Sequence, residues 1–441
     1  MRLSLLISGL IPALVALFAA PALAEMKIEA ATSPGGVPFW LVEDHSQPFT
    51  ALSINFLGGT SLDAPGKRGA VTLMTGLLEE GSGKMDSQGF AEAREALAAR
   101  MSFDPSADAV TVSARFLTEN RNAAIDLLHQ ALVDPTFDAP SIKRVKGQIA
   151  AIQKNNASDP GQIASEQLDK LLFGAHPYGT SDLGTPDSLK ALTRADLVAA
   201  HDAALTRDRV RIAASGDINA VQLGLLIDKL VEGLPAKGGK NPPDIAPDAS
   251  GKTVVVPFDT PQSSVVFAQK GLRIDDPDYF AAAVLQQIIG GQGFSAILLD
   301  EVREKRGLTY GIGAGLDLMS HSTQWRGGFA SANDRVAEAV KVVRDIWAKV
   351  ADKGVTSEQV EKAKTYMTGS YPLQFNGNVT IAAILGGMQV LGLPPDYVGT
   401  RNDKVKAVTL TDVNRVAKSL MTPDKLTFVV VGQPKDLAST P

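Results

Sequence analysis

The chain has no cysteine among its 441 residues. Disulfides, cysteine-ligated metals and thiol nucleophiles are therefore excluded. Histidine is scarce, and no two histidines stand at the spacing of roughly three to five residues that lets one helix face hold a metal. The five are His45, His129, His176, His201 and His321. No Gly-x-Ser-x-Gly segment is present for a serine nucleophile. The sequence predicts no metal site and no familiar nucleophile in this chain.

Charge of one sign is not concentrated along the sequence. The 43 basic and 48 acidic residues are interspersed and leave a net charge of −5. A protein that binds nucleic acid or an anionic membrane usually carries a basic stripe. We therefore expect neither of these partners.

Long apolar runs are absent after the first 24 residues. Met1-Arg2 is followed by a largely apolar run, Leu3–Ala20, and then by Ala22-Leu23-Ala24. This order is typical of a secretory signal peptide cleaved after Ala24, residues 1–24. Polar residues and a proline within the run disfavour the alternative, a retained membrane anchor. We expect 417 of the 441 residues to remain in a periplasmic or secreted protein without a membrane association.

A change of composition divides the mature chain. Pro235–Gly251 contains four prolines and three glycines with few large apolar residues, which is typical of a linker. It separates an N-terminal half, residues 25–234, from a C-terminal half, residues 252–441.

The same order of elements is expected in both halves. A helix at Asn122–Val133 and a second at Ser141–Ile152 correspond to helices at Arg335–Val350 and Ser357–Met367. Each half closes with a strand that ends at a glycine, Gly216 or Gly432. The repeat predicts an α+β fold made of two homologous halves of about 200 residues each, in which helices pack on an antiparallel-rich sheet.

The stretch Ile288–Gly315 carries the clearest local pattern. It predicts a glycine-rich turn, an amphipathic helix that ends at Gly307, and a strand with Leu308, Tyr310 and Ile312 on one face. Arg303 and Tyr310 lie seven positions apart across the helix-to-strand turn and are able to share one space. The alternative interpretation is a surface arginine and a half-buried core tyrosine.

At these residues the chain resembles the pitrilysin/insulinase family of zinc peptidases. The resemblance comprises the glycine turn with Gly290, Gly291 and Gly293, the segment Arg-Glu-Lys-Arg-Gly-Leu that begins at Arg303, and the following Tyr310. The duplicated layout and the loop Ala175-His176-Pro177-Tyr178-Gly179 extend it over the mature chain. It implies that Arg303 and Tyr310 contact a peptide substrate near the scissile carbonyl, while the glycines allow the backbone to move against the peptide.

The zinc site of active members is missing from this chain. Their His-x-x-Glu-His motif places two zinc ligands and a general base on one helix. The corresponding positions here hold Thr72, Thr75 and Gly76. The distal glutamate should fall near Ala150 or Ala151, and no acidic residue occurs between Ser141 and Ser158. We therefore expect the chain not to hydrolyse peptides by itself.

In this family two chains can divide the work, with zinc held by one and the arginine–tyrosine pair by the other. The resemblance therefore implies a non-catalytic, substrate-binding subunit of a heterodimeric periplasmic zinc peptidase. The expected partner is a homologous subunit that holds the zinc. The alternative is a peptide-binding or structural homologue with no hydrolytic partner.

Overall fold

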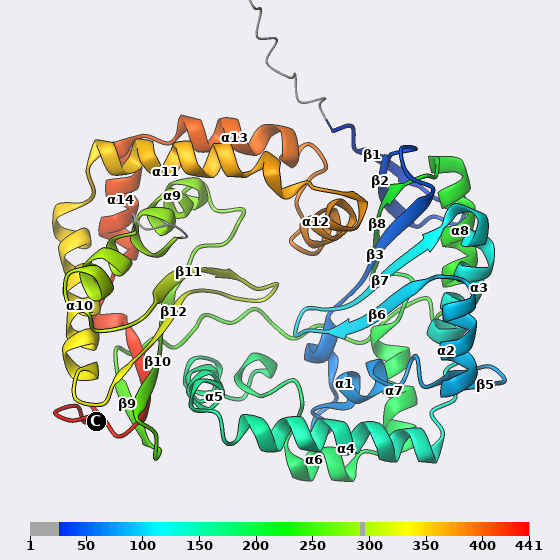
Figure 1. The fold of residues 1–441 in the computed structure, drawn as a ribbon, viewed down its shortest axis with the longest axis horizontal. Helices are drawn as coiled ribbons and strands as arrows, with labels where there is room; N and C mark the ends of the chain where they lie inside the picture. Colours follow the sequence, from blue (N-terminus) through cyan, green and yellow to red (C-terminus); the bar gives the residue numbers. More distant parts are fainter. Residues whose placement is uncertain (1–25, 292–295, 441) are drawn as a thin grey trace, which may run out of the picture.

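The computed structural model describes residues 26–291 and 296–440. Two halves lie side by side, each with a sheet and its own set of helices (Figure 1). The N-terminal half contains a six-stranded sheet in the order β1-β2-β8-β3-β7-β6. Its strands are β1 (Glu29–Thr32), β2 (Pro38–Glu43), β3 (Phe49–Leu57), β6 (Arg100–Pro105), β7 (Ala109–Leu117) and β8 (Val210–Gly216), beside a separate hairpin of β4 (Gly81–Ser82) and β5 (Met85–Asp86).

The C-terminal half contains a five-stranded sheet in the order β11-β12-β10-β13-β9. Its strands are β9 (Thr253–Pro257), β10 (Gln262–Lys270), β11 (Ile312–Leu318), β12 (Thr323–Ala332) and β13 (Thr427–Gly432). In each sheet one pair is parallel, β2 with β8 and β9 with β13, and the other pairs are antiparallel. Apart from the additional strand β1, the strands of both halves have the same order and directions, which confirms the predicted duplication and the α+β class.

The helices of the N-terminal half are α1 (Ala70–Thr75), α2 (Ser87–Ala96), α3 (Arg121–Val133), α4 (Ala139–Asn156), α5 (Pro160–Phe173), α6 (Pro186–Ala191), α7 (Arg194–Ala204) and α8 (Ala220–Val231). Those of the C-terminal half are α9 (Tyr279–Gly290), α10 (Val336–Lys353), α11 (Ser357–Ser370), α12 (Asn378–Val390), α13 (Tyr397–Ala407) and α14 (Leu410–Leu420). Short 3₁₀ turns lie at Gly59–Leu62, Thr118–Asn120, Pro177–Gly179, Pro372–Gln374 and Pro423–Lys425, and a π-helical turn at Leu299–Glu304. Among the described residues, no helix combines the length and the apolar composition needed to cross a membrane.

The central strand β3 is buried along both faces. Leu52, Ile54 and Phe56 point into the core formed with the helices of the same half. The alternate residues Ser53 and Asn55 are also buried, although they are polar. A sheet open to water on one face would expose such residues, so another element must cover this second face.

The covering element comes from the other half of the chain. Helix α12 packs on β8 and β3 (Figure 1), where the Gln389 Nε2 group donates to the Ile212 carbonyl at 3.1 Å and the Ser215 hydroxyl donates to Asn378 Oδ1 at 2.8 Å. The approach requires glycine at position 386, because a Cβ there would stand 2.3 Å from the Ser53 Oγ atom.

Helix α5 makes the reciprocal contact with the C-terminal sheet. Its apolar residues join a cluster with β10 and β13, which includes Leu168, Leu172, Val429 and Val431. An ion pair between Asp169 of α5 and Arg326 of β12 adds a polar link. Each half therefore depends on a helix of the other half to cover its sheet.

Another contact between the two halves centres on Tyr178 in the His-Pro-Tyr-Gly loop. Its hydroxyl donates to Asp108, in the turn between β6 and β7, and accepts the His321 backbone N–H at 3.0 Å. Asp108 also accepts the Ser320 N–H at 2.8 Å, so one tyrosine–aspartate pair holds the β11–β12 turn of the other half. Burial and the adjacent carboxylate raise the pKa of Tyr178 above its ordinary value.

The expected linker also contacts the β11–β12 turn beside Tyr178. No helix or strand is assigned between Val231 and Thr253. The Ile245 N–H donates to the His321 carbonyl at 2.8 Å, and the His321 Nδ1 atom lies 2.9 Å from Asp244 Oδ1. The segment is irregular in structure, yet hydrogen bonds hold it against the C-terminal half.

We expect Tyr178→Phe to weaken the whole fold. The substitution keeps the ring but leaves the Asp108 Oδ1 atom and the His321 N–H without the partner that the hydroxyl provides, at a cost of about 1–3 kcal/mol. Urea unfolding monitored by circular dichroism should show a lower midpoint. Tyr366→Phe, at an exposed tyrosine on α11, is the control and should leave the midpoint unchanged. Equal midpoints for the two variants would contradict a structural role for the Tyr178 hydroxyl.

Candidate functional site

The first candidate site is helix α1, which occupies the position expected for a zinc motif. The Thr72 hydroxyl donates to the Asp182 carbonyl at 2.6 Å. Thr75 is completely buried, and its hydroxyl has no hydrogen-bond partner among the described residues. Gly76 ends the helix and lies close to α4, where a Cβ at position 76 would meet the Val145 side chain at 3.2 Å.

The α4 residues that face the core carry no metal ligand either. Val145 and Ile149 are buried in the N-terminal core, whereas Ala150 and Ala151 lie on the exposed side of the helix. The expected distal position therefore does not point at α1, and its hydrophobic neighbours occupy the contact. Hydroxyl and aliphatic groups do not match the nitrogen, sulfur or carboxylate ligands of zinc. Residues 26–291 and 296–440 contain no group of three or more histidines and acidic residues arranged to hold a metal.

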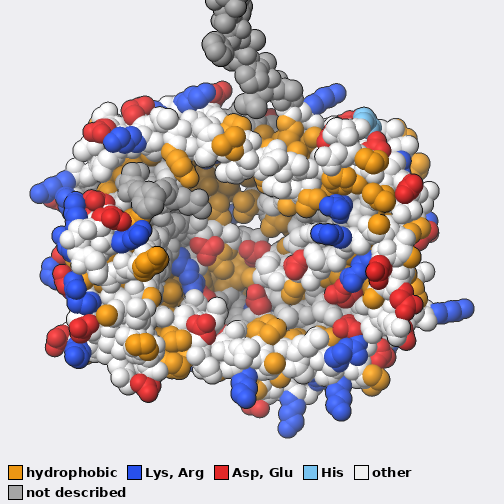
Figure 2. Space-filling model, viewed as in Figure 1, with side chains coloured by type: hydrophobic (Ala, Val, Ile, Leu, Met, Phe, Trp, Pro, Cys, Tyr) orange, Lys and Arg blue, Asp and Glu red, His pale blue; other side chains and the backbone are white. Residues whose placement is uncertain are grey.

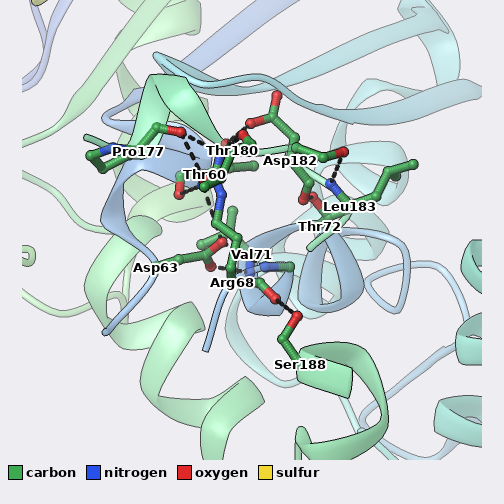
Figure 3. A network of polar contacts seen from close by, with 12 residues as sticks. Thr60, Asp63, Arg68, Val71, Thr72, Pro177, Thr180, Asp182, Leu183 and Ser188 are labelled. Carbon is green, nitrogen blue, oxygen red and sulfur yellow. Dashed lines mark hydrogen bonds and ion pairs between the residues drawn. The ribbon is translucent and has the colours of Figure 1, made fainter. Parts of the chain in front are cut away.

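A structural network stabilises the start of α1 and centres on Arg68 (Figure 3). Its guanidinium donates to Asp182 at 2.6 Å and to the carbonyls of Thr60, Pro177 (3.1 Å) and Thr180 (3.0 Å). One arginine thus ties the loop after α5 to the turn before α1. Sequence reasoning did not identify Arg68 as important, because no pattern along the chain relates it to residues more than a hundred positions away.

Asp63 caps the N-terminus of α1 inside this network. Its two carboxylate oxygens accept the N–H groups of Gly69 and Val71, both at 2.8 Å, which are donors left free by the first helical turn. Burial raises the pKa of the Asp63 carboxyl above its ordinary value, although these bonds and Arg68 oppose the shift. These contacts anchor α1 but supply no chemistry for hydrolysis.

The second candidate site is the turn that contains Arg303 and Tyr310. The predicted amphipathic helix is a π-helical turn over Leu299–Glu304, in which the Lys305 N–H donates to the Asp300 carbonyl five residues earlier. Gly307 ends it with φ of 60°, as predicted, and its N–H donates to the Arg303 carbonyl at 2.8 Å. Single π turns inside helices are frequent at functional sites.

The expected strand starts later than predicted. Strand β11 begins at Ile312, so Tyr310 lies in the preceding turn rather than on a strand face. The neighbouring residues of Tyr310 hold this turn on β12. The Ser331 hydroxyl donates to the Leu308 carbonyl at 2.5 Å, and the Thr309 hydroxyl donates to the Ala330 carbonyl at 2.7 Å. The backbone around Tyr310 is therefore fixed while its side chain is free to contact other molecules.

Arg303 and Tyr310 meet in the structure. The Arg303 Cζ atom lies 5.4 Å from the centroid of the Tyr310 ring, within the range of a cation–π contact. Tyr310 is 92% exposed, so it is not the half-buried core residue of the alternative interpretation. The side chain of Arg303 is 34% exposed, and its Nε lies 3.5 Å from Glu304. The arrangement presents a guanidinium and a phenol hydroxyl together at the surface.

The glycines before this turn serve close packing. Gly290 is the last residue of α9, and a Cβ there would stand 2.5 Å from both the N and O atoms of Ala314 on β11. Gly290 and Gly291 do not adopt the left-handed backbone that only glycine tolerates easily. Position 293 lies outside the described residues. A role for these glycines in movement against a peptide therefore stays a prediction.

The two halves enclose a hollow on the face shown in Figure 2, where acidic, basic and hydrophobic side chains are visible.

Comparison with known proteins supports a relationship to the insulinase family of peptidases. The family description "Insulinase (Peptidase family M16)" matches residues 39–185, and "Peptidase M16 inactive domain" matches residues 191–367. The "Non-peptidase homolog YmxG" of Helicobacter pylori is 26% identical over 404 residues, which cover 90% of this chain and 92% of that protein.

Solved structures give the same result. A crystal structure of a peptidase M16 inactive domain from Pseudomonas fluorescens is 30% identical, with a TM-score of 0.87, and covers 94% of this chain and 99% of that one. A protease from Helicobacter pylori has a TM-score of 0.82 and covers 92% of this chain and 99% of that one. Its identity of 16% supports the similarity of fold alone.

We expect the purified chain to bind no stoichiometric zinc, because the α1 and α4 positions hold only hydroxyl, glycine and aliphatic groups. Metal analysis after dialysis should find far less than one zinc per chain, and added zinc should not raise the melting temperature. One tightly bound zinc that is lost on replacing a histidine would contradict this assignment.

Two substitutions on α1 should have opposite effects on stability. Thr75→Val removes a buried hydroxyl without a partner and should raise the free energy of unfolding by about 1 kcal/mol. Thr72→Val removes the bond to the Asp182 carbonyl and should lower it by about 1 kcal/mol. The two variants are matched in chemistry and in helix propensity, so each serves as the control of the other. Destabilisation by both would show that the Thr75 hydroxyl has a partner.

Proposed function

We propose that this chain, which belongs to the insulinase family of peptidases (peptidase family M16) and is a non-catalytic member of it, is the substrate-binding subunit of a heterodimeric zinc peptidase. The partner would be a homologous subunit that carries the zinc motif. The chain would supply Arg303 and Tyr310 to the active site of that partner.

The observation that carries the proposal is the exposure of the Arg303–Tyr310 pair. An isolated tyrosine that is 92% exposed gains little from burial, so packing within this chain does not explain its position. The residues on either side are fixed to β12 by hydrogen bonds, which holds the ring in place beside a guanidinium. A fixed backbone with free polar side chains suits a contact with a second molecule.

The chemistry of the pair fits the stabilisation of negative charge. The Arg303 guanidinium is permanently charged and presents several N–H donors, and the Tyr310 hydroxyl donates one more hydrogen bond. When a peptide carbonyl is attacked, its oxygen gains charge, and donors positioned around it lower the barrier. In the proposed complex, Arg303 and Tyr310 would donate to this oxygen while the partner supplies the attacking water. The partner would hold the zinc and this chain would supply the two donors, so catalysis by the complex would not need zinc ligands on α1.

The proposal includes export of this chain from the cytoplasm. The first 24 residues have the order of a basic start, an apolar run and an Ala-x-Ala site, which supports a periplasmic or secreted location. A zinc-bearing partner would have to reach the same compartment.

A second candidate is a peptide-binding or structural protein without a hydrolytic partner. The polar network around Arg68 favours this second candidate, because it gives α1 a structural role. The exposed arginine–tyrosine pair favours the first candidate, since a structural protein gains nothing from it.

The two candidates differ in what Arg303→Ala and Tyr310→Phe should do to a reconstituted complex with a zinc-bearing homologue. If the pair stabilises the transition state, each substitution should lower kcat by roughly 10²–10³-fold, about 3–4 kcal/mol. Complex formation on size-exclusion chromatography and the melting temperature should stay the same, because both side chains are at the surface. Steady-state cleavage of an unstructured peptide measures the effect.

Arg273→Ala and Tyr366→Phe, at exposed residues elsewhere in the C-terminal half, are the matched controls and should keep normal turnover. Turnover within a few-fold of the unmodified complex in both test variants would support the second candidate. Failure to form any complex at micromolar concentrations would refute the assembly itself.

A further inference from the structure

A groove lies on the outer side of the N-terminal half, between α4 and α6. Its cavity volume is about 440 Å³, within the range of roughly 300–1,000 Å³ typical of binding pockets. The apolar part of its lining is formed by Ala150, Ala157, Pro186 and Leu189. Both helices lie at the lower edge of the molecule in Figure 1.

The charged part of the lining is entirely basic. Lys146, Lys154 and Lys190 line the groove, and no carboxylate does. Helix α4 has no aspartate or glutamate in its 18 residues. Figure 2 shows Lys and Arg side chains projecting along the lower edge of the molecule. The sequence has no basic stripe, but folding brings lysines more than forty positions apart to one recess.

Lys146 is held in place without a counter-charge. Its ammonium donates to the carbonyls of Leu192 at 2.7 Å and Lys190 at 3.2 Å, which uses two of its three hydrogens. It forms no ion pair among the described residues, and burial lowers its pKa below the ordinary value. Asp196, the carboxylate that acts on it from a distance, is paired with Lys67 at 2.8 Å. An anion bound beside Lys146 would offset the cost of the partial desolvation of its ammonium group.

We propose that this groove binds an acidic segment of a partner protein. An aliphatic side chain of the segment would pack on Ala150 and Leu189, and flanking carboxylates would pair with Lys146, Lys154 and Lys190. Charge complementarity identifies the partner, because a recess with three ammonium groups and an apolar floor favours carboxylates next to an aliphatic group. A lipid surface fits less well, since a flat anionic layer reaches the rim lysines but not the floor of a groove.

The groove is independent of the proposed peptidase role. It lies in the N-terminal half, whereas Arg303 and Tyr310 belong to the C-terminal half. Substitutions in the groove can therefore be tested on the intact chain without affecting the pair.

The test measures binding of a fluorescein-labelled, acetylated and amidated peptide, Glu-Glu-Leu-Glu-Glu, to the full chain by fluorescence anisotropy. The unmodified chain should bind it, with affinity that falls as salt rises. Lys154→Glu/Lys190→Glu should weaken binding at least tenfold through charge reversal. Ala150→Trp should weaken it as much by filling the groove, while the melting temperature stays within a few degrees.

Lys143→Glu/Lys170→Glu is the control, because it changes the net charge equally at exposed lysines outside the lining. This variant should bind within twofold of the unmodified chain, and the peptide Glu-Glu-Ser-Glu-Glu should bind more weakly than the leucine peptide. Equal losses in test and control variants would mean non-specific attraction and overturn the proposal. So would the absence of peptide binding, or a preference for vesicles of anionic phospholipid over the peptide.

Discussion

The exchange of helices between the halves is the constraint on which the rest of the structure depends. The sheet of each half is buried on both faces, but its own helices cover only one of them. Helix α12 covers β3 and β8 of the first half, and α5 covers β10 and β13 of the second. Removing either helix would expose buried backbone and side chains of the opposite sheet, so neither half is complete alone. The Tyr178–Asp108 pair then holds the β11–β12 turn against the first half.

The contacts that hold helix α1 do not depend on the positions at which a zinc motif is expected. Helix α1 is stabilised by Asp63 at its first turn and by the loop that Arg68 holds beside it. Neither contact involves the positions that would carry a metal. Thr72 has become part of the network through the Asp182 carbonyl, and Gly76 lets α4 approach with Val145. A Cβ at position 76 would stand 3.2 Å from the Val145 side chain, so a larger residue there would require Val145 to shift slightly.

The opposite holds for Arg303 and Tyr310. Here the supporting contacts are made by the Leu308 carbonyl and the Thr309 hydroxyl, and the side chains of Arg303 and Tyr310 contribute almost nothing to the core. A position that is structurally fixed while its side chains are energetically dispensable is typical of a binding surface. The same contrast applies to the α4–α6 groove, where Lys146 is held by carbonyls yet lacks a counter-ion.

The sequence by itself predicted the duplication, which the structure confirms, and it showed that Thr72, Thr75 and Gly76 stand where a zinc motif would be expected. These depend on composition and on the order of elements, which local residue patterns express directly. It also placed Gly307 correctly at the end of a helix and brought Arg303 and Tyr310 together, because only seven residues separate them.

Tertiary structure alone decided which residues pair across the chain. Arg68 meets Asp182, Tyr178 meets Asp108, and α12 reaches β3, each over a separation that no local pattern records. It also decided that Tyr310 is exposed in a turn and that Ala150 faces a groove rather than α1. The reason is physical: exposure and long-range pairing depend on how the two sheets are covered, and the covering helix of each sheet lies in the other half of the sequence.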